Sequence, residues 1–333
     1  MRMLLGLLLA ASFAHAAKTL DMYFVDVEGG QATLIVTPNK ESILVDTGWP
    51  GFNGRDADRI KAAAKQAGVK DIDYLILTHY HTDHAGGVSQ LLTRLPVKTF
   101  VDHGANNETS KGAGELSAAW DKAVATGKRL TVKPGDKIPL KGGIELLIVS
   151  ANGDVIGSAV KGAGTANPAC SATEFPVDPT ENARSVGFLL TYGKFRTINL
   201  GDLTAQKEAA LVCPENKLGK VDLFLTTHHG TDTSNPQTIV HALAPRVAIM
   251  NNGAKKGGSA KVWNIVKSSP GLEDLWQLHF AVAGGKEANV ADSFIANLNE
   301  ACEGQSIKVS ATNDGSFTVL NTRNKYAKTY AAK

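Results

Sequence analysis

Residues 73–87, DYLILTHYHTDHAGG, constrain the fold of this chain more than any other stretch. Tyr74 to Thr78 is a short apolar run of the buried-strand type, and Gly86 and Gly87 permit a tight turn into a helix. Ligand-type side chains follow the strand at once, namely His79, His81, Asp83 and His84. We therefore predict a metal-binding loop at the end of a strand.

The spacing of these side chains suits two metal ions. Side chains two apart at a strand end point the same way, so His79 and His81 can bind one ion together, whereas Asp83 and His84 can face a second. Imidazole nitrogen and carboxylate oxygen suit zinc. Two such ions roughly 3.5 to 4 Å apart can clamp the oxygens of a reacting ester. The alternative, a surface tract or core histidines close by chance, is disfavoured by this density behind a strand.

The HxHxDH pattern resembles that of metallo-β-lactamase-fold hydrolases. Further segments match that superfamily in order, namely ILVDTG at 43–48, NLGDL at 199–203 and TTHHG at 226–230. The opening VDVEGGQATLIV and the late HHG are most similar to the branch with the nuclease-like domain of DNA-uptake competence proteins. That branch commonly has Gln-Gly-Asp where this chain has Gly29-Gly30-Gln31, so any role of that aspartate is lost. The resemblance implies an α/β fold, a four-layer αββα sandwich.

The resemblance also implies roles for single residues. Asp46 would orient the metal ligands, and Asp202 would bridge both ions. His103 is the candidate third histidine of the first ion, because no histidine occurs from 104 to 227. It lies earlier than the usual third histidine, so a supporting or structural role is the alternative. His228 and His229 are adjacent in a segment that we expect to be extended, so they should point apart. We assign His228 as the ligand and His229 as a contact for substrate oxygen, and the reverse assignment stays open.

The implied function is metal-dependent hydrolysis. A hydroxide held between two zinc ions would attack an ester or phosphodiester centre of a small molecule or phosphodiester substrate. Asp83 and Asp202 would orient the water or accept its proton, and His229 would help to stabilise the oxyanion. Iron or manganese would suit the same ligands.

Two alternatives remain for the function. A β-lactam or lactone could be hydrolysed on the same fold, although the best-known zinc β-lactamases use cysteine where this chain has Asp202. An exported metal-binding protein without catalysis is the third hypothesis. The complete ligand set for the second ion (Asp83, His84, Asp202 and His228) disfavours it.

The N-terminus resembles a secretory signal peptide at residues 1–16. Arg2 is followed by an apolar core, Met3 to Leu9, and by an A-x-A cleavage site at Ala14 to Ala16. We therefore expect a periplasmic or secreted protein. The apolar core is too short to span a membrane. Without Arg2 the formal charge falls from +3 to +2, which favours neither a membrane-surface helix nor a nucleic-acid-binding stripe, so nucleic acid is expected only as a substrate.

Residues 17–333 are expected to form a single domain, because ligands from 79 to 228 must converge. A long insertion at about 151–183, rich in Gly, Ala, Pro, Asn and Thr, is expected to be a loop that governs substrate choice.

An exported chain with Cys170, Cys213 and Cys302 permits one disulfide. We favour Cys170 with Cys213, since each lies in a Pro-containing loop. Zinc ligation by these thiols is the rival interpretation, disfavoured by the absence of CxxC. The sequence does not indicate an oligomeric state.

Several further segments have recognisable patterns. Hairpins are expected at 20–37, 185–200 and 307–320, and a helix at 55–66 that ends at Gly68. Residues 251–259, NNGAKKGGS, form a glycine-rich basic turn; it is either a solvated loop or a cradle in which Lys255 or Lys256 meets an anion. His279 is expected to be a strand residue or a distal pocket contact, and His241 a packed or capping residue.

Overall fold

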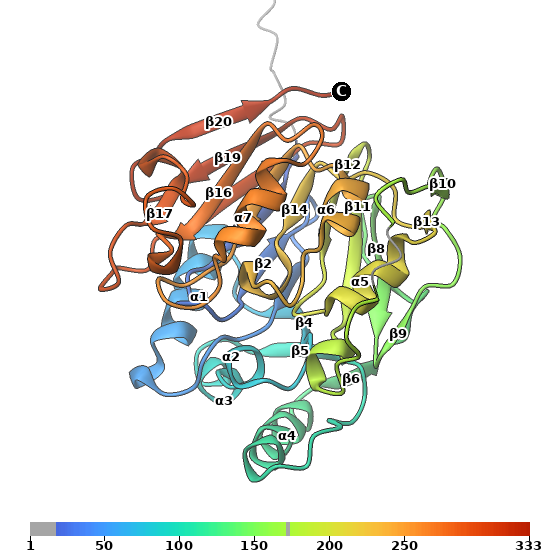
Figure 1. The fold of residues 1–333 in the computed structure, drawn as a ribbon. Coiled ribbons are helices and arrows are strands. Elements are labelled where there is room, and N and C mark those ends of the chain that lie inside the picture. The colour runs from blue at the N-terminus through green and yellow to red at the C-terminus, as the bar shows by residue number, and fades with distance from the viewer. Residues whose placement is uncertain (1–17, 171–173) are drawn as a thin grey trace, which may run out of the picture.

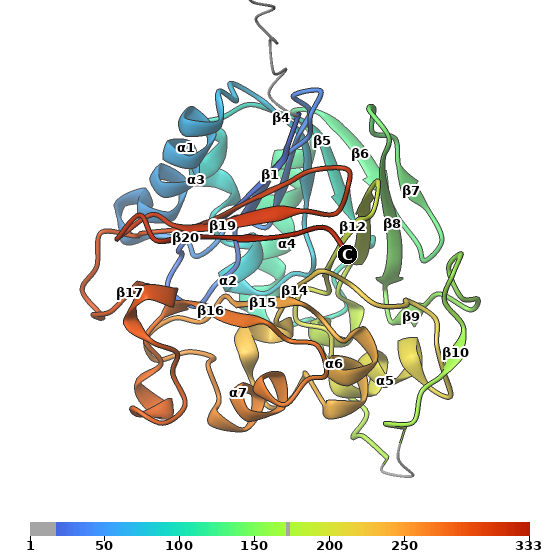
Figure 2. The same cartoon turned by 90° about the horizontal axis from the view of Figure 1, so that it is seen from above.

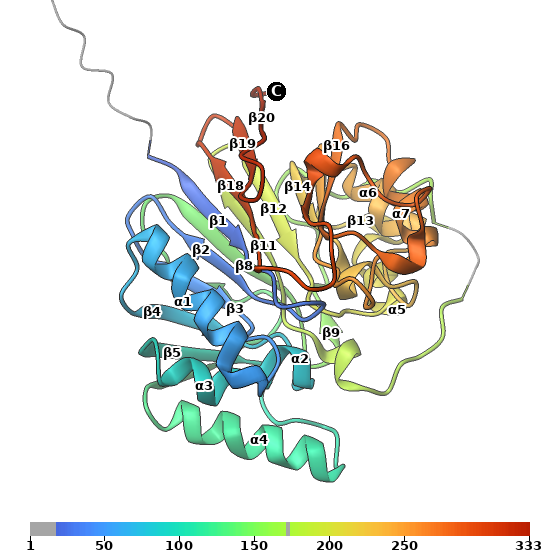
Figure 3. The ribbon, with the colours of Figure 1, turned by 90° about the vertical axis from the view of Figure 1, so that its left-hand side faces the viewer.

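The computed structural model describes residues 18–170 and 174–333, so the expected signal peptide lies outside the described residues. Two nine-stranded sheets pack face to face, and helices cover the outer face of each (Figures 1 and 2). The structure therefore confirms the four-layer αββα architecture. Figure 3 shows the layers from the side, with α1, α3 and α4 beyond one sheet and α5, α6 and α7 beyond the other.

The first sheet has the strand order β20-β19-β18-β1-β2-β3-β4-β5-β6. Its strands are β1 (Leu20–Phe24), β2 (Thr33–Val36), β3 (Ser42–Val45), β4 (Ile72–Ile76), β5 (Val97–Asp102), β6 (Lys128–Thr131), β18 (Ile307–Ala311), β19 (Phe317–Asn321) and β20 (Ala327–Tyr330). Strands β3 to β6 run parallel. Its helices are α1 (Arg55–Ala67), α2 (Thr82–Ala85), α3 (Val88–Leu92) and α4 (Lys111–Val124).

The second sheet has the order β17-β16-β15-β14-β12-β11-β8-β7, with β9 paired to β8. Its strands are β7 (Lys137–Ile138), β8 (Ile144–Ala151), β9 (Asp154–Val155), β11 (Gly187–Tyr192), β12 (Phe195–Asn199), β14 (Leu223–Leu225), β15 (Val247–Met250), β16 (Asp274–His279) and β17 (Ile295–Asn297). Its helices are α5 (Ala205–Val212), α6 (Gln237–Leu243) and α7 (Ala260–Lys267). β12, β14, β15 and β16 run parallel, and a separate pair joins β10 (Thr165–Ala166) to β13 (Glu215–Asn216).

Three apolar cores hold the layers together. The central core lies between the sheets, and the outer two lie between each sheet and its helices. Strand β3 contributes to two of these cores, because Ile43 and Val45 enter the central core and Leu44 enters the outer one. Successive side chains of a strand point to opposite faces, so a strand covered on both sides is apolar throughout.

The local expectations hold where the pattern was strong. The hairpins β1–β2, β11–β12 and β18–β19 are antiparallel as predicted, and α1 ends at Gly68, whose positive φ of 73° suits glycine. The stretch 151–183 contains β9, β10 and the beginning of a 3₁₀ helix at Glu181–Arg184. Among the described residues, no helix is long and apolar enough to cross a membrane.

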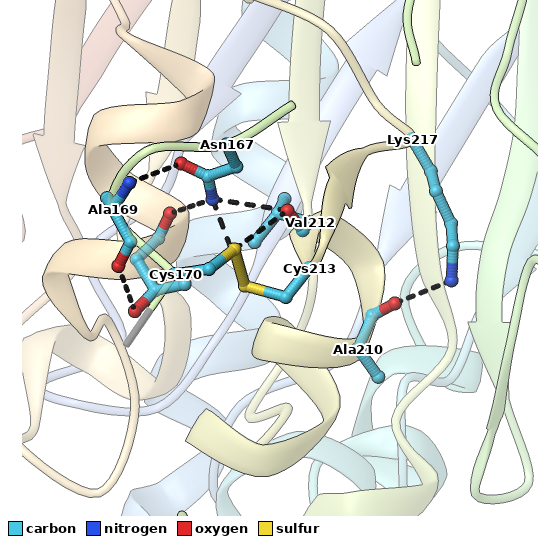
Figure 4. The surroundings of a disulfide bond; sticks show 8 residues. Asn167, Ala169, Cys170, Ala210, Val212, Cys213 and Lys217 are labelled. Carbon is cyan, nitrogen blue, oxygen red and sulfur yellow. Dashed lines mark hydrogen bonds between the residues drawn. A yellow bond between two sulfur atoms is a disulfide. The ribbon is translucent and has the colours of Figure 1, made fainter. Parts of the chain in front are cut away.

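The predicted disulfide between Cys170 and Cys213 is confirmed (Figure 4). Beside it, the Asn167 side-chain amide donates to the carbonyl oxygens of Val212 and Thr238, each at 3.1 Å. These contacts fix Asn167, and with it the segment before the disulfide, to α5 and α6. Cys302 is a free thiol.

Candidate metal centre

The HxHxDH segment connects the end of β4 to the short helix α2. The Nε2 atom of His79 lies 3.0 Å from Nδ1 of His81, so the first two histidines converge as their spacing predicts. Asp83 and His84 lie within α2, and both side chains are buried. The carboxyl ends of the parallel strands of both sheets meet at this edge, and such edges are where ligands bind in α/β proteins.

Asp46 organises the His84 ring from the end of β3. Its Oδ1 accepts a hydrogen bond from the Thr78 amide at 2.8 Å, and its Oδ2 accepts one from the Thr78 hydroxyl at 2.7 Å. The Asp46 carboxylate also lies 2.7 Å from Nδ1 of His84. That contact leaves Nε2 of His84 directed at Asp83 and Asp202, at 3.1 and 3.2 Å. Asp46 thus contacts the ring of one predicted ligand, and its orienting role stays a prediction.

Asp202 lies at the centre of the site. It follows β12, and its Oδ2 is surrounded by the Nε2 atoms of histidines from both halves of the chain. The distances are 3.2 Å to His84, 3.4 Å to His228, 3.4 Å to His229 and 4.0 Å to His79. One buried carboxylate oxygen thus faces both sets of predicted ligands.

The expectation that His228 and His229 point apart in an extended segment is wrong. Both residues have left-handed backbone conformations, with φ of 51° and 56°. This conformation is uncommon outside glycine, and residues held in it cluster at functional sites. It curls the segment after β14 so that both rings reach Asp202. His229 is buried and also lies 3.1 Å from Oδ2 of Asp83, whereas the His228 side chain is 16% exposed.

The residues at the centre fit a divalent metal ion. Asp83, His84, Asp202 and His229 each offer a ligand atom, and these atoms lie within 4.8 Å of one another. Within the described part of the chain, the buried Oδ1 of Asp202 finds no hydrogen-bond partner. A buried polar atom without a partner is unfavourable unless a ligand satisfies it. Nitrogen and carboxylate donors suit zinc, iron or manganese.

Electrostatics at the centre keep the carboxylates ionised. Burial alone would raise the pKa of Asp202, but the imidazoles of His84, His229 and His228 hold it well below its ordinary value. Burial likewise opposes ionisation of Asp83, and His84 and His229 lower its pKa well below the usual range. Ionised carboxylates are the form that binds metal ions.

His103 lies apart from this cluster. It is buried, and its Nε2 lies 2.9 Å from Oε2 of Glu181. Glu181 also accepts a hydrogen bond from the Asn107 amide, and its own amide donates to Glu108. Glu108 in turn lies 3.1 Å from Nε2 of His81. The structure thus places His103 in a network behind His81, and its role as a metal ligand stays a prediction.

Sequence reasoning missed two polar residues near the site and did not identify the partner of a third, Lys256. Glu108 lies on a loop and Glu181 begins the 3₁₀ helix, and neither belongs to a motif, so no local signal marks them. Lys256 contacts the Asp83 carboxylate and lies 4.9 Å from the ring centroid of Trp49. Its glycine-rich basic turn was visible in the sequence, but its position against Asp83 depends on the packing of the two halves.

A second cluster near this edge contains the buried Asp26 and His279 and the half-buried Cys302. Nε2 of His279 lies 2.7 Å from Oδ1 of Asp26, and a guanidinium nitrogen of Arg59 lies 3.0 Å from Oδ2. The Cys302 thiol donates to the same Oδ2 at 3.3 Å. His279 therefore pairs with a carboxylate that sequence reasoning did not single out.

Comparison with known proteins identifies relatives of part of this chain. The model of the metallo-beta-lactamase superfamily matches residues 25–163. The protein named Recombination protein 2 of Haemophilus influenzae is 26% identical over 236 residues, covering 69% of this chain and 24% of that protein. The protein named ComE operon protein 3 of Bacillus subtilis is 26% identical over 244 residues, covering 69% and 28% respectively. The chain thus spans about a quarter of the length of these relatives.

Among solved structures, the CmlA beta-hydroxylase E377D mutant is similar with a TM-score of 0.44 and 14% identity, over 80% of this chain and 53% of that chain. The family match and the curated relatives confirm the resemblance drawn from the motifs. Residues 25–163 of this chain thus match the metallo-β-lactamase superfamily, whose members are metal-dependent hydrolases.

Proposed function

We propose that this chain is an exported zinc-dependent hydrolase that holds two ions and cleaves an ester or phosphodiester bond. The position of Asp202 carries the proposal, because its Oδ2 faces His79 on one side and His84 and His229 on the other. A carboxylate between two histidine groups is what a bridging ligand requires. A site for one ion would not need ligands on both sides of it.

The ligands divide into two groups around Asp202. His79 and His81 would hold the first ion, and Asp83, His84 and one histidine of the HHG segment the second. We favour His229 as that histidine, since its Nε2 lies against both carboxylates while its Nδ1 is 3.3 Å from the Asn251 amide nitrogen. His228 is partly exposed and would contact substrate oxygen. This is the reverse of the assignment favoured from the sequence.

The bound zinc would supply a water of lowered pKa and polarise the substrate oxygen. The chain itself supplies orientation and proton acceptors. Asp46 and Thr78 fix the His84 ring, and the ionised Asp83 and Asp202 can accept hydrogen bonds from water. Lys256 lies against Asp83 and can neutralise developing negative charge on the substrate. His103 and Glu181 support the loop that carries His81.

Export is supported by the leader-like N-terminal sequence together with the Cys170–Cys213 disulfide, since disulfides persist in oxidising compartments.

Hydrolysis assays with a matched histidine pair test the proposal. Zinc-loaded protein should hydrolyse p-nitrophenyl acetate or bis(p-nitrophenyl) phosphate, and His81→Ala should lose this activity. His241→Ala is the control, because His241 lies on α6, where its ring meets Gln237 and Ser268. It should keep full activity. Cleavage of nitrocefin alone would favour the β-lactam alternative, and no cleavage of any substrate by zinc-loaded protein would contradict the proposal.

A further inference from the structure

A hollow of about 820 Å³ lies beside the metal centre, on the side of the second sheet. Its walls come from the N-terminal ends of α5, α6 and α7 and from the segment around Phe175 and Pro176. The three helices lie side by side on the outer face of the sheet (Figure 3). Each begins after a loop that leaves the carboxyl end of β12, β14 or β15, so the hollow opens at the same edge as the metal ligands.

Two threonines join the hollow to the metal centre. Thr204, which lines it, comes two residues after Asp202. Thr233 also lines it, and its hydroxyl lies 3.1 Å from Nδ1 of His228. The Ala205 amide donates to the Thr233 carbonyl at 3.1 Å, which ties the two segments together. The segments that carry Asp202 and His228 therefore also form part of the wall of the hollow.

The lining is largely apolar but contains an unsatisfied hydroxyl. Phe175, Pro176, Val262 and Ile265 supply apolar surface. Thr204 is only 3% exposed, and within the described residues its Oγ1 has no hydrogen-bond partner. It precedes α5 but accepts no capping hydrogen bond from that helix. A buried hydroxyl without a partner is unfavourable, and a polar atom of a ligand in the hollow would satisfy it.

The charged residues of the lining exclude one class of substrate. Glu174, Asp178 and Asp232 face the hollow, against a single cation, Lys261. This excess of carboxylates repels a polyanion and attracts neutral or cationic groups. We propose that the hollow binds the apolar part of a small neutral or positively charged ester, with Thr204 hydrogen-bonded to it. The proposal rests on the hydrolase function above and narrows its substrate class away from nucleic acid.

A chain-length series tests the apolar part of the proposal. Wild-type protein should hydrolyse p-nitrophenyl octanoate with a higher kcat/KM than p-nitrophenyl acetate. Phe175→Ala should lower kcat/KM for the octanoate roughly tenfold and leave the acetate within about twofold, because it removes apolar contact but no ligand. Val177→Ala is the matched control, since Val177 lies on the same segment, is 74% exposed and does not line the hollow. Equal effects of both variants, or no preference for the octanoate, would overturn the proposal.

A binding measurement makes the test independent of turnover. Octyltrimethylammonium should bind the zinc-loaded protein more tightly than octyl sulfate by titration calorimetry, and Phe175→Ala should weaken it roughly tenfold while Val177→Ala does not. Tighter binding of octyl sulfate would overturn the charge preference. Binding as predicted without hydrolysis of any ester would contradict the hydrolase function yet support the hollow as a ligand site. Hydrolysis of an ester without binding in the hollow would support the hydrolase function and contradict the hollow as a ligand site.

Discussion

Two buried carboxylates, Asp202 and Asp26, lie in clusters of ligand-type side chains, yet their surroundings differ. Asp202 Oδ2 is surrounded by histidine nitrogens, and its Oδ1 has no partner among the described residues. Asp26 has both oxygens occupied, by His279 and the Glu28 amide on one and by Arg59 and the Cys302 thiol on the other. Burial and ligand chemistry alone therefore do not identify a metal site. Among the described residues, the two carboxylates differ in that Asp202 keeps an unsatisfied oxygen and has no Lys or Arg contact, whereas Arg59 already pairs with Asp26.

We accordingly interpret the Asp26 cluster as an ion-pair network that fixes β1 to β16 and to α1. Its guanidinium already neutralises the carboxylate, so a metal ion would have to displace Arg59. The metal centre has Lys256 against Asp83, but no cation contacts Asp202 in the described structure other than histidine. The following predictions test this distinction.

The largest effect is expected at Asp202. Asp202→Ala removes the carboxylate that faces both ligand groups, so turnover of p-nitrophenyl acetate should be abolished while the far-ultraviolet circular dichroism stays unchanged. Full activity in a folded variant would contradict the bridging role.

Asp26→Asn should affect stability instead. It leaves His279 and Arg59 without their buried carboxylate, and breaking a buried pair costs about 3–5 kcal/mol. Urea unfolding should show this loss, with kcat of the folded protein unchanged. Asp58→Asn is the matched control, because Asp58 pairs with Arg94 at the surface with its side chain 60% exposed, and its removal should change the stability far less. A loss of bound zinc in Asp26→Asn would show that the two clusters are not separate.

The pH dependence of stability should reflect the same network. Burial would lower the pKa of His279, but its hydrogen bond to Asp26, with Cys302 nearby, raises it to about 9. The folded state therefore binds the His279 proton more tightly than the unfolded state does. Its contribution to the free energy of unfolding is complete below about pH 6.5 and is lost as the pH rises through 9. This shift in the pKa of His279 corresponds to about 3 kcal/mol in the free energy of unfolding.

Urea unfolding between pH 6 and 10 measures this loss. Glu208, whose pKa burial raises to about 8, also lowers the stability as the pH rises over part of this range. The difference between wild type and Asp26→Asn isolates the His279 contribution, and it should shrink from pH 6.5 to 10. A constant difference would rule out the paired imidazolium.

Asp46→Asn should have the smallest of these effects. The amide can still hydrogen-bond to Thr78 but no longer holds the His84 ring as a carboxylate does. Loss of such an orienting partner typically lowers metal affinity or activity by roughly 10- to 100-fold. Competition with a zinc chelator measures the affinity, and Asp73→Asn, a partly exposed aspartate at Lys98, is the control. An unchanged zinc affinity in Asp46→Asn would contradict the orienting role of Asp46.

The sequence predicted those parts of the site that depend on short-range spacing. His79, His81, Asp83 and His84 follow one strand, so the strand periodicity sufficed to place them together. Asp202 and the HHG segment required the family resemblance, because the sequence shows neither the sheet order nor the meeting of the two halves. The hairpins, α1 and the Cys170–Cys213 bond rest on local signals and are confirmed.

The remainder depends on contacts between distant segments. The pair of Asp26 and His279 joins residues 253 positions apart, and the VDVEGG segment that contains Asp26 does not indicate its partner. The orientation of His228 and His229 depends on a left-handed backbone, which their residue types do not predict because neither is glycine. Such features follow from how the packed halves constrain the loops, which single-sequence patterns do not encode.

Zinc counting by native mass spectrometry tests the central claim most directly. We expect about two zinc ions per wild-type chain and about two in Asp26→Asn, but fewer in Asp202→Ala, because only Asp202 faces both ligand groups. One ion or none in the zinc-loaded wild-type protein, or an unchanged count in Asp202→Ala, would contradict a two-ion centre built around Asp202.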